Sequence, residues 1–138
     1  MKPMNPRLFG ALERAFGRGQ IKVIRAGVRM RVKYETELDG DGQERERLRR
    51  LSSGEEYHVK CPICRDYKHR LSISYMCGEP DRNGRVNLWM MQCWNENCFA
   101  DFTARRDFFE KLYADGGGEF VTEGPEYASD DTLVRKGK

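Results

Sequence analysis

The sequence predicts a small α+β protein, because apolar residues recur at helical spacing near both ends and alternate with polar residues between them. Its 138 residues are enough for one domain or two very small ones. Hydrophobic residues make up 38% of the chain and charged residues 34%, which is too polar for a single well-filled core. The 15 aromatic residues are too many for a fully disordered chain. A domain of this kind needs stabilisation beyond its core.

Two helices are predicted, one near each end of the chain. Asn5 can cap the first, Pro6 suits its first turn and Gly17 can end it. Its apolar stripe consists of Leu8, Phe9, Leu12, Ala15 and Phe16. The second is predicted over residues 102–113, with Asp101 or Thr103 as its cap. Its expected core residues are Phe102, Phe108, Phe109, Leu112 and Tyr113.

A basic β-hairpin is predicted after the first helix, with strands over 21–25 and 28–35 joined at Ala26 and Gly27. One face would carry Val28, Met30, Val32 and Tyr34, and the other Arg29, Arg31 and Lys33. Residues 1–34 hold nine basic groups and one acidic group, which favours a polyanionic partner. Basic residues that alternate along an edge strand also prevent aggregation, so this face has a second interpretation.

The composition changes after residue 36. Residues 37–55 are interpreted as an acidic and charged linker, with a loop over 37–42 and a run of helical character over 43–51. The predicted organisation is therefore a helix and basic hairpin over 1–36, the linker over 37–55, a compact domain over 56–115 and a flexible tail over 116–138.

Four of the five cysteines fall into two close pairs. Cys61 and Cys64 are separated by two residues, Cys93 and Cys98 by four, and 28 residues lie between the pairs. In a chain without an export signal, such pairs indicate metal ligands rather than disulfides. Segments 71–76 and 85–91 alternate and flank a turn over 79–84, so a hairpin can return the second pair to the first. This arrangement predicts a zinc ribbon.

The expected cofactor is one structural Zn²⁺, since four thiolates complete a tetrahedral shell. Four thiolates also suit an iron–sulfur cluster, and some of the cysteines could instead be small buried hydrophobes. Cys77 lies far from both pairs and is not expected to bind metal. Because the shell is full, His58 and His69 are expected to be surface or strand residues.

The sequence does not predict an enzyme. It contains no phosphate-binding glycine loop, no nucleophile elbow and no glutamate beside a ligand in a hydrolytic zinc pattern. No stretch approaches the roughly 20 apolar residues of a membrane span, and the first residues lack the apolar run of a signal peptide. A cytoplasmic location without membrane contact is therefore expected.

The chain resembles the zinc-ribbon domain of bacterial and bacteriophage DNA primases. The similarity covers roughly residues 56–113 and is carried by YHVKCPIC at 57–64, LSISY at 71–75, WMMQCW at 89–94 and DFFEKL at 107–112. The family usually separates its second cysteine pair by two residues, whereas here the gap is four. The catalytic domain of a primase has no counterpart in this chain.

The resemblance implies that the chain binds single-stranded DNA in replication and works with a catalytic subunit of a primase, helicase or polymerase. It also implies a bacteriophage or mobile-element origin. The residues expected to contact DNA are Arg29, Arg31, Lys33, Lys68, Arg70, Ser72, Ser74, Arg85, Asn87 and Trp89. Trp89 could instead pack under the second helix. The alternative functions are a zinc-stabilised adaptor that docks on a replication or transcription enzyme, and a transcription-associated ribbon.

Overall fold

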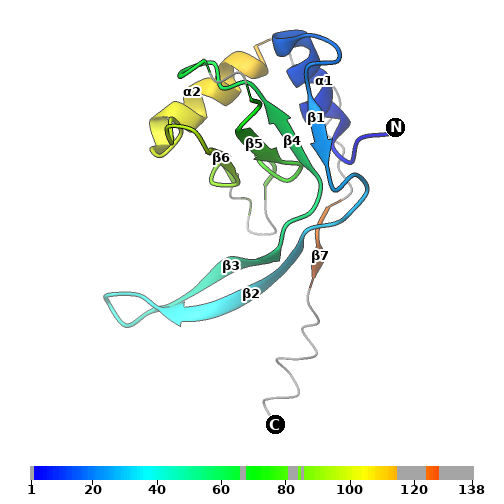
Figure 1. Ribbon diagram of the computed structural model, residues 1–138. Coiled ribbons are helices and arrows are strands. Elements are labelled where there is room, and N and C mark those ends of the chain that lie inside the picture. The colour runs from blue at the N-terminus through cyan, green and yellow to red at the C-terminus, as the bar shows by residue number, and fades with distance from the viewer. Residues whose placement is uncertain (1, 66–67, 81–83, 85, 115–123, 128–138) are drawn as a thin grey trace.

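The computed structural model describes residues 2–65, 68–80, 84, 86–114 and 124–127. Figure 1 shows two helices beside one sheet, with a long two-stranded arm extending from it. The elements described are α1 (Pro6–Phe16), β1 (Lys22–Ile24), β2 (Arg31–Leu38), β3 (Glu44–Ser52), β4 (Glu56–Val59), β5 (Leu71–Ser74), β6 (Met91–Cys93), α2 (Phe102–Leu112) and β7 (Glu126–Tyr127). The predicted α+β class is confirmed. Within the described residues, neither helix has the length and hydropathy needed to cross a membrane.

Helix α1 begins and ends where its sequence predicts. The Asn5 side chain accepts a hydrogen bond of 3.0 Å from the Leu8 N–H, and Pro6 occupies the first turn. The helix ends at Gly17, whose φ of 103° is accessible to glycine at little cost. Leu8, Ala11 and Leu12 are buried, but Ala15 is exposed because the buried stripe is narrower than predicted.

The main sheet has the strand order β1-β4-β5-β6, with every neighbouring pair antiparallel. All four residues of β5 are buried, as expected for a central strand under the helices. Helix α1 reaches β4 through an edge contact between the Phe9 and Tyr57 rings, whose centroids are 5.5 Å apart. It meets α2 through Phe16 and Phe108, at 6.4 Å. The core therefore lies between this sheet and the two helices.

The arm is a second sheet with the order β3-β2-β7. Val32 and Tyr34 are buried along β2, and the Tyr34 ring stacks on Tyr127 of β7 with the centroids 6.0 Å apart. The other face carries cross-strand ion pairs, namely Arg45 with Asp39 at 2.8 Å, Arg47 with Glu37 at 3.5 Å and Arg49 with Glu35 at 3.1 Å. Opposite charges on facing positions favour this register.

The predicted basic hairpin is wrong in its pairing. A turn does form at residues 25–28, but β1 pairs with β4 and β2 pairs with β3. The stretch interpreted as a linker with helical character is also wrong, because residues 44–52 form β3 and residues 39–43 make the turn of the arm. The alternation of β2 itself is confirmed, except that Val28 is exposed rather than apolar core.

The hairpin that joins the cysteine pairs is confirmed in outline. β5 pairs antiparallel with β6, but β6 begins at Met91 rather than at residue 85. Residues 86–90 follow an irregular path that contains one isolated bridge, between Pro80 and Val86. Half of the predicted turn, residues 81–83, lies outside the described part. Within the predicted tail, β7 pairs with β2, and residues 116–123 and 128–138 lie outside the described part.

A buried carboxyl group connects the arm to the main sheet. Glu55 is fully buried, and its carboxylate oxygens accept hydrogen bonds from the Met4 N–H at 2.9 Å, the Gly27 N–H at 2.8 Å and the Tyr57 hydroxyl. Its backbone N–H donates to the Val28 carbonyl at 2.9 Å. These bonds satisfy a polar group that would be costly to bury alone. Through Met4, Glu55 holds the residues before α1, and through Gly27 it holds the turn before β2. Both are thereby fixed to the start of β4, where Tyr57 lies.

Gly54 is needed where this connection passes close to the residues that lead into β2. A Cβ atom at position 54 would come within 3.0 Å of backbone atoms of Val28, Arg29 and Met30. Backbone atoms cannot rotate away as side chains do. We expect Gly54→Ala to lower the free energy of unfolding by roughly 1–3 kcal/mol in urea titrations of the metal-loaded protein.

Gly40→Ala is the matched control, because nothing lies within 4 Å of a Cβ atom at position 40. Its free energy of unfolding should stay within about 0.5 kcal/mol of the original protein. Equal stability of the two variants would contradict the close packing of residue 54 against β2.

Candidate metal centre and the groove beside it

The four cysteines predicted as ligands meet at one end of the main sheet. Cys61 follows β4, Cys93 ends β6, and Cys64 and Cys98 lie in the turns that come after them. The pairing of β4 with β5 and of β5 with β6 brings the two turns together. All four sulfur atoms lie within 4.8 Å of one another, and the Cys64 and Cys93 sulfurs are 3.7 Å apart.

This donor set fits one metal ion. Tetrahedral coordination with metal–sulfur bonds of about 2.3 Å would place the sulfurs about 3.8 Å apart, which matches the Cys64–Cys93 separation. Cys61 and Cys93 are buried, and Cys64 and Cys98 are half-buried. Four sulfur donors complete a tetrahedral shell and leave no position for a reacting water. The cluster is therefore suited to hold a metal as a structural cross-link.

Backbone N–H groups near Cys93 favour the thiolate form of this residue, which is the form that binds a metal. Burial alone would raise the pKa of Cys93, but the backbone N–H groups of Cys98, Glu96 and Asn95 stabilise its thiolate and lower that pKa to about 6. Burial raises the pKa of Cys61, and it also raises the pKa of Cys98, where neighbouring cysteine sulfurs add to the effect. The cluster thus favours one thiolate beside protonated neighbours until a cation replaces the protons.

Cys77 and His58 lie outside the cluster. Cys77 is fully buried in the core, and this burial raises its pKa to about 12. It therefore behaves as a small hydrophobic residue. His58 lies on β4, where its Nε2 atom is 3.0 Å from Oε1 of Glu56. Both positions agree with the sequence interpretation of these residues.

We expect Cys93→Ser to abolish stoichiometric metal binding, because it removes the thiol best prepared to act as a ligand. Cys77→Ala is the matched control, since it removes a buried cysteine outside the cluster and should retain one ion per chain. Elemental analysis of the purified proteins measures both. Retention of a full equivalent of metal by Cys93→Ser would contradict the assigned ligand set.

Metal affinity should fall as the pH falls, because protons compete for the sulfurs. At neutral pH the raised pKa values of Cys61 and Cys98 keep both thiols protonated in the metal-free protein, so metal uptake should release at least about two protons. Below about pH 6 Cys93 is protonated as well, which should steepen the dependence. Competition with a chromophoric chelator across a pH series measures this. An affinity independent of pH would contradict four-thiolate binding.

A groove runs beside the metal centre, between the arm and the segment that leads into β6. It consists of two hollows that share Trp89, and we call them together the Trp89 groove. The larger, about 620 Å³, is lined by Glu37, Arg45, Glu46, Arg47, Leu48, Val86, Asn87 and Trp89. The smaller, about 100 Å³, is lined by Arg50, Ser53, Glu56, Ser72, Trp89, Met90, Met91, Gln92 and Trp94.

Both tryptophans of the chain line this groove, and both are exposed. Trp89 is 41% exposed and Trp94, the residue after Cys93, is 62% exposed. Their indole N–H groups are already bonded, Trp89 to Oδ1 of Asn87 at 3.2 Å and Trp94 to Oγ of Ser72 at 3.0 Å. The Arg50 guanidinium lies 6.0 Å from the Trp89 ring centre. The rings are thus held in place with apolar surface open to solvent.

The structure places the predicted polar DNA-binding residues differently from expectation. Ser72, Ser74 and Asn87 are buried, and their side-chain oxygens accept hydrogen bonds from Trp94, the Met76 N–H and Trp89 respectively. The expectation that they form an exposed reading face is wrong, because these side chains support the tryptophans and the local backbone instead. Of the two interpretations left open for Trp89, packing under α2 is wrong, because Trp89 is exposed and lines the groove beside β3.

The predicted basic residues are spread over the surface. Arg29, Arg31 and Lys68 are exposed, and Lys33 and Arg70 are half-buried. Arg31 pairs with Glu126 at 3.3 Å, and Lys33 pairs with Glu35 at 3.5 Å. Arg85 lies outside the described residues.

Sequence analysis missed the arginines that line the groove, namely Arg45, Arg47 and Arg50. They were assigned to a linker because residues 44–50 show no alternation of apolar and polar residues. A signal was present in the charges. When the two segments run antiparallel, Glu35 faces Arg47 and Glu37 faces Arg45.

Comparison with known proteins adds no identification. No family model matches the chain, and neither a curated protein nor a solved structure matches it significantly. The function is therefore argued from the metal centre and the groove.

Proposed function

We propose that this chain is a zinc-ribbon protein of DNA-primase type that binds single-stranded DNA in replication. The observation that carries the proposal is the Trp89 groove, where two exposed indole rings face an arginine-bearing strand beside a four-sulfur cluster. The resemblance of residues 56–113 to primase zinc ribbons supports it.

Trp89 and Trp94 offer exposed aromatic rings on which unpaired bases can stack. Single strands are bound by stacking bases on aromatic rings, worth about 1–3 kcal/mol per base, and this works for any base because each has a flat π surface. Since Asn87 and Ser72 already bond the indole N–H groups, the exposed parts of Trp89 and Trp94 are free to stack. A base pair inside a duplex does not offer its face, so single strands are favoured.

The arginines of β3 supply contacts to phosphates. Arg45 and Arg47 pair with Asp39 and Glu37, and these are surface ion pairs that contribute little stability. A phosphate can therefore compete for either guanidinium at small cost. Arg50, beside Trp89, is placed to contact the backbone of a nucleotide stacked on that ring.

Zinc is the metal that this role favours. Two cysteine turns closed by a hairpin form a four-sulfur site suited to Zn²⁺, which would cross-link the ribbon and hold Trp94 beside Cys93. The absorption spectrum distinguishes zinc from an iron–sulfur cluster, since only the cluster is coloured. The partner that this role implies is a catalytic subunit of a primase, helicase or polymerase.

Substitution of the tryptophans tests the proposal. We expect Trp89→Ala and Trp94→Ala each to weaken binding of a fluorescein-labelled oligothymidylate by about 5- to 150-fold, the equivalent of one lost stack. Fluorescence anisotropy measures this, with metal content checked for each variant. Phe102→Ala is the matched control, because Phe102 is an equally exposed aromatic that does not line the groove, and it should bind normally.

Binding should also fall steeply with salt, because phosphate contacts release counterions. If metal-loaded, folded protein binds neither single strands nor duplex, the proposal is wrong. Equal losses for Phe102→Ala and Trp89→Ala would place the DNA elsewhere on the surface.

A further inference from the structure

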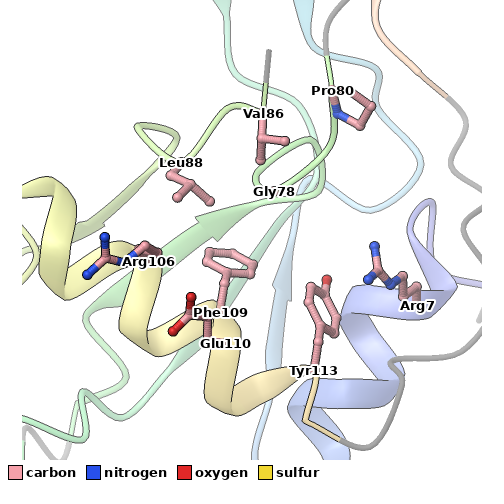
Figure 2. A pocket seen from close by; sticks show the side chains of 9 residues that line it. All are labelled: Arg7, Gly78, Pro80, Val86, Leu88, Arg106, Phe109, Glu110 and Tyr113. Atoms are coloured by element: carbon pink, nitrogen blue, oxygen red, sulfur yellow. The ribbon is translucent and has the colours of Figure 1, made fainter. Parts of the chain in front are cut away.

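A second pocket lies on the other side of the segment that carries Trp89. It has a volume of about 540 Å³ and opens between α2 and a wall that includes Gly78, Pro80 and Leu88, with Arg7 of α1 at one end (Figure 2). Its lining residues include Leu88, whereas Asn87 and Trp89 line the Trp89 groove. Val86 borders both cavities, and we call this second cavity the α2 pocket.

We propose that the α2 pocket binds a short acidic segment of a partner protein that inserts one bulky apolar side chain. This inference goes beyond the proposed function, because it concerns a different surface and a different class of ligand. The wall of the pocket is apolar, formed by Phe109, Leu88 and Val86, with Gly78 and Pro80 at its edge. Its volume falls within the range of about 300–1,000 Å³ that is typical of binding sites.

The charges at the rim favour an acidic ligand. The pocket is lined by two arginines and one glutamate. The Arg7 guanidinium lies 4.0 Å from the Tyr113 ring centre at one end, and Arg106, with a half-exposed side chain, lies toward the other (Figure 2). Carboxylates on either side of an apolar anchor would meet these two cations.

The aromatic rings of the pocket argue against a nucleic acid as its ligand. Phe109 is only 6% exposed, and the Tyr113 ring is covered by Arg7. Neither ring offers an open face on which a base could stack, unlike Trp89 and Trp94. The apolar wall is instead suited to an aliphatic or aromatic side chain of a ligand. Binding of that side chain would remove the wall from contact with water.

One buried polar atom also points to a ligand with carbonyl or carboxylate oxygens. The Tyr113 hydroxyl is buried without a hydrogen-bond partner among the described residues, and it points toward the cleft in Figure 2. Burial raises the pKa of this hydroxyl, so it remains a donor at neutral pH. A peptide oxygen that enters the pocket would satisfy it.

The test uses the full metal-loaded chain and a fluorescein-labelled peptide, acetyl-Gly-Asp-Glu-Phe-Glu-Asp-Gly-amide. We expect saturable binding, a loss of at least about tenfold when alanine replaces phenylalanine in the peptide, and a loss of about fivefold for Arg106→Glu. Lys111→Glu, a charge reversal on the same helix outside the pocket, is the matched control and should bind normally.

Two-dimensional amide NMR locates the ligand. The peptide should shift the signals of Gly78, Leu88 and Phe109 and leave both tryptophan indole N–H signals unchanged, whereas oligothymidylate should do the reverse. The inference is overturned if the peptide does not bind at millimolar concentration, if it shifts the indole signals instead, or if Arg106→Glu binds it normally. It is also overturned if those three amides shift with protein concentration alone, since a second copy of the chain would then occupy the pocket.

Discussion

The convergence of two cysteine pairs on one point is the constraint on which the rest of the structure depends. The pairs are separated by 28 residues, and only the antiparallel path of β4, β5 and β6 brings their sulfurs within 4.8 Å. With 38% hydrophobic residues the chain has little apolar material for a core, so a metal bound at this point would supply folding energy directly. It would also hold the end of β6, from which Trp94 projects, and the turn that leads into α2.

The position of the arm depends on a second constraint, the buried carboxyl group of Glu55. Its bonds to Met4, Gly27 and Tyr57 tie the chain before α1 and the turn before β2 to the main sheet. Gly54 permits the close approach of backbones that this connection needs. As a result β3 faces the segment that carries Trp89. The groove therefore forms between the arm and the segment that leads into β6.

Local signals were sufficient to predict both helices and the four cysteines that form the cluster. The caps Asn5 and Asp101 act over three residues, and the cysteine spacing is visible without tertiary information. The arm could not be found in the same way, because β3 consists mostly of charged residues that pair across to β2 and lacks the apolar alternation that marks a strand. Ser72 and Asn87 were misplaced for a related reason. Strand periodicity assigns each residue to a face, but Ser72 bonds Trp94 from a distant segment, and residues 86–90, which contain Asn87, do not form the regular strand that the periodicity assumes.

These features divide the molecule into one scaffold around the cysteine cluster and two surfaces of different chemistry. The surface facing the arm combines open indole rings with arginines, and the surface beside α2 combines an apolar wall with a charged rim. We propose that a bound metal supports the Trp89 groove, the surface that we infer to bind single-stranded DNA. The most direct test compares zinc-loaded and chelator-treated chain for binding of a labelled single-stranded oligonucleotide, with circular dichroism of the same samples. We predict that the zinc-loaded protein prefers single strands over duplex and that chelation removes both the binding and the ordered ribbon. Binding unchanged by chelation, or none by folded zinc-loaded protein, would contradict the account.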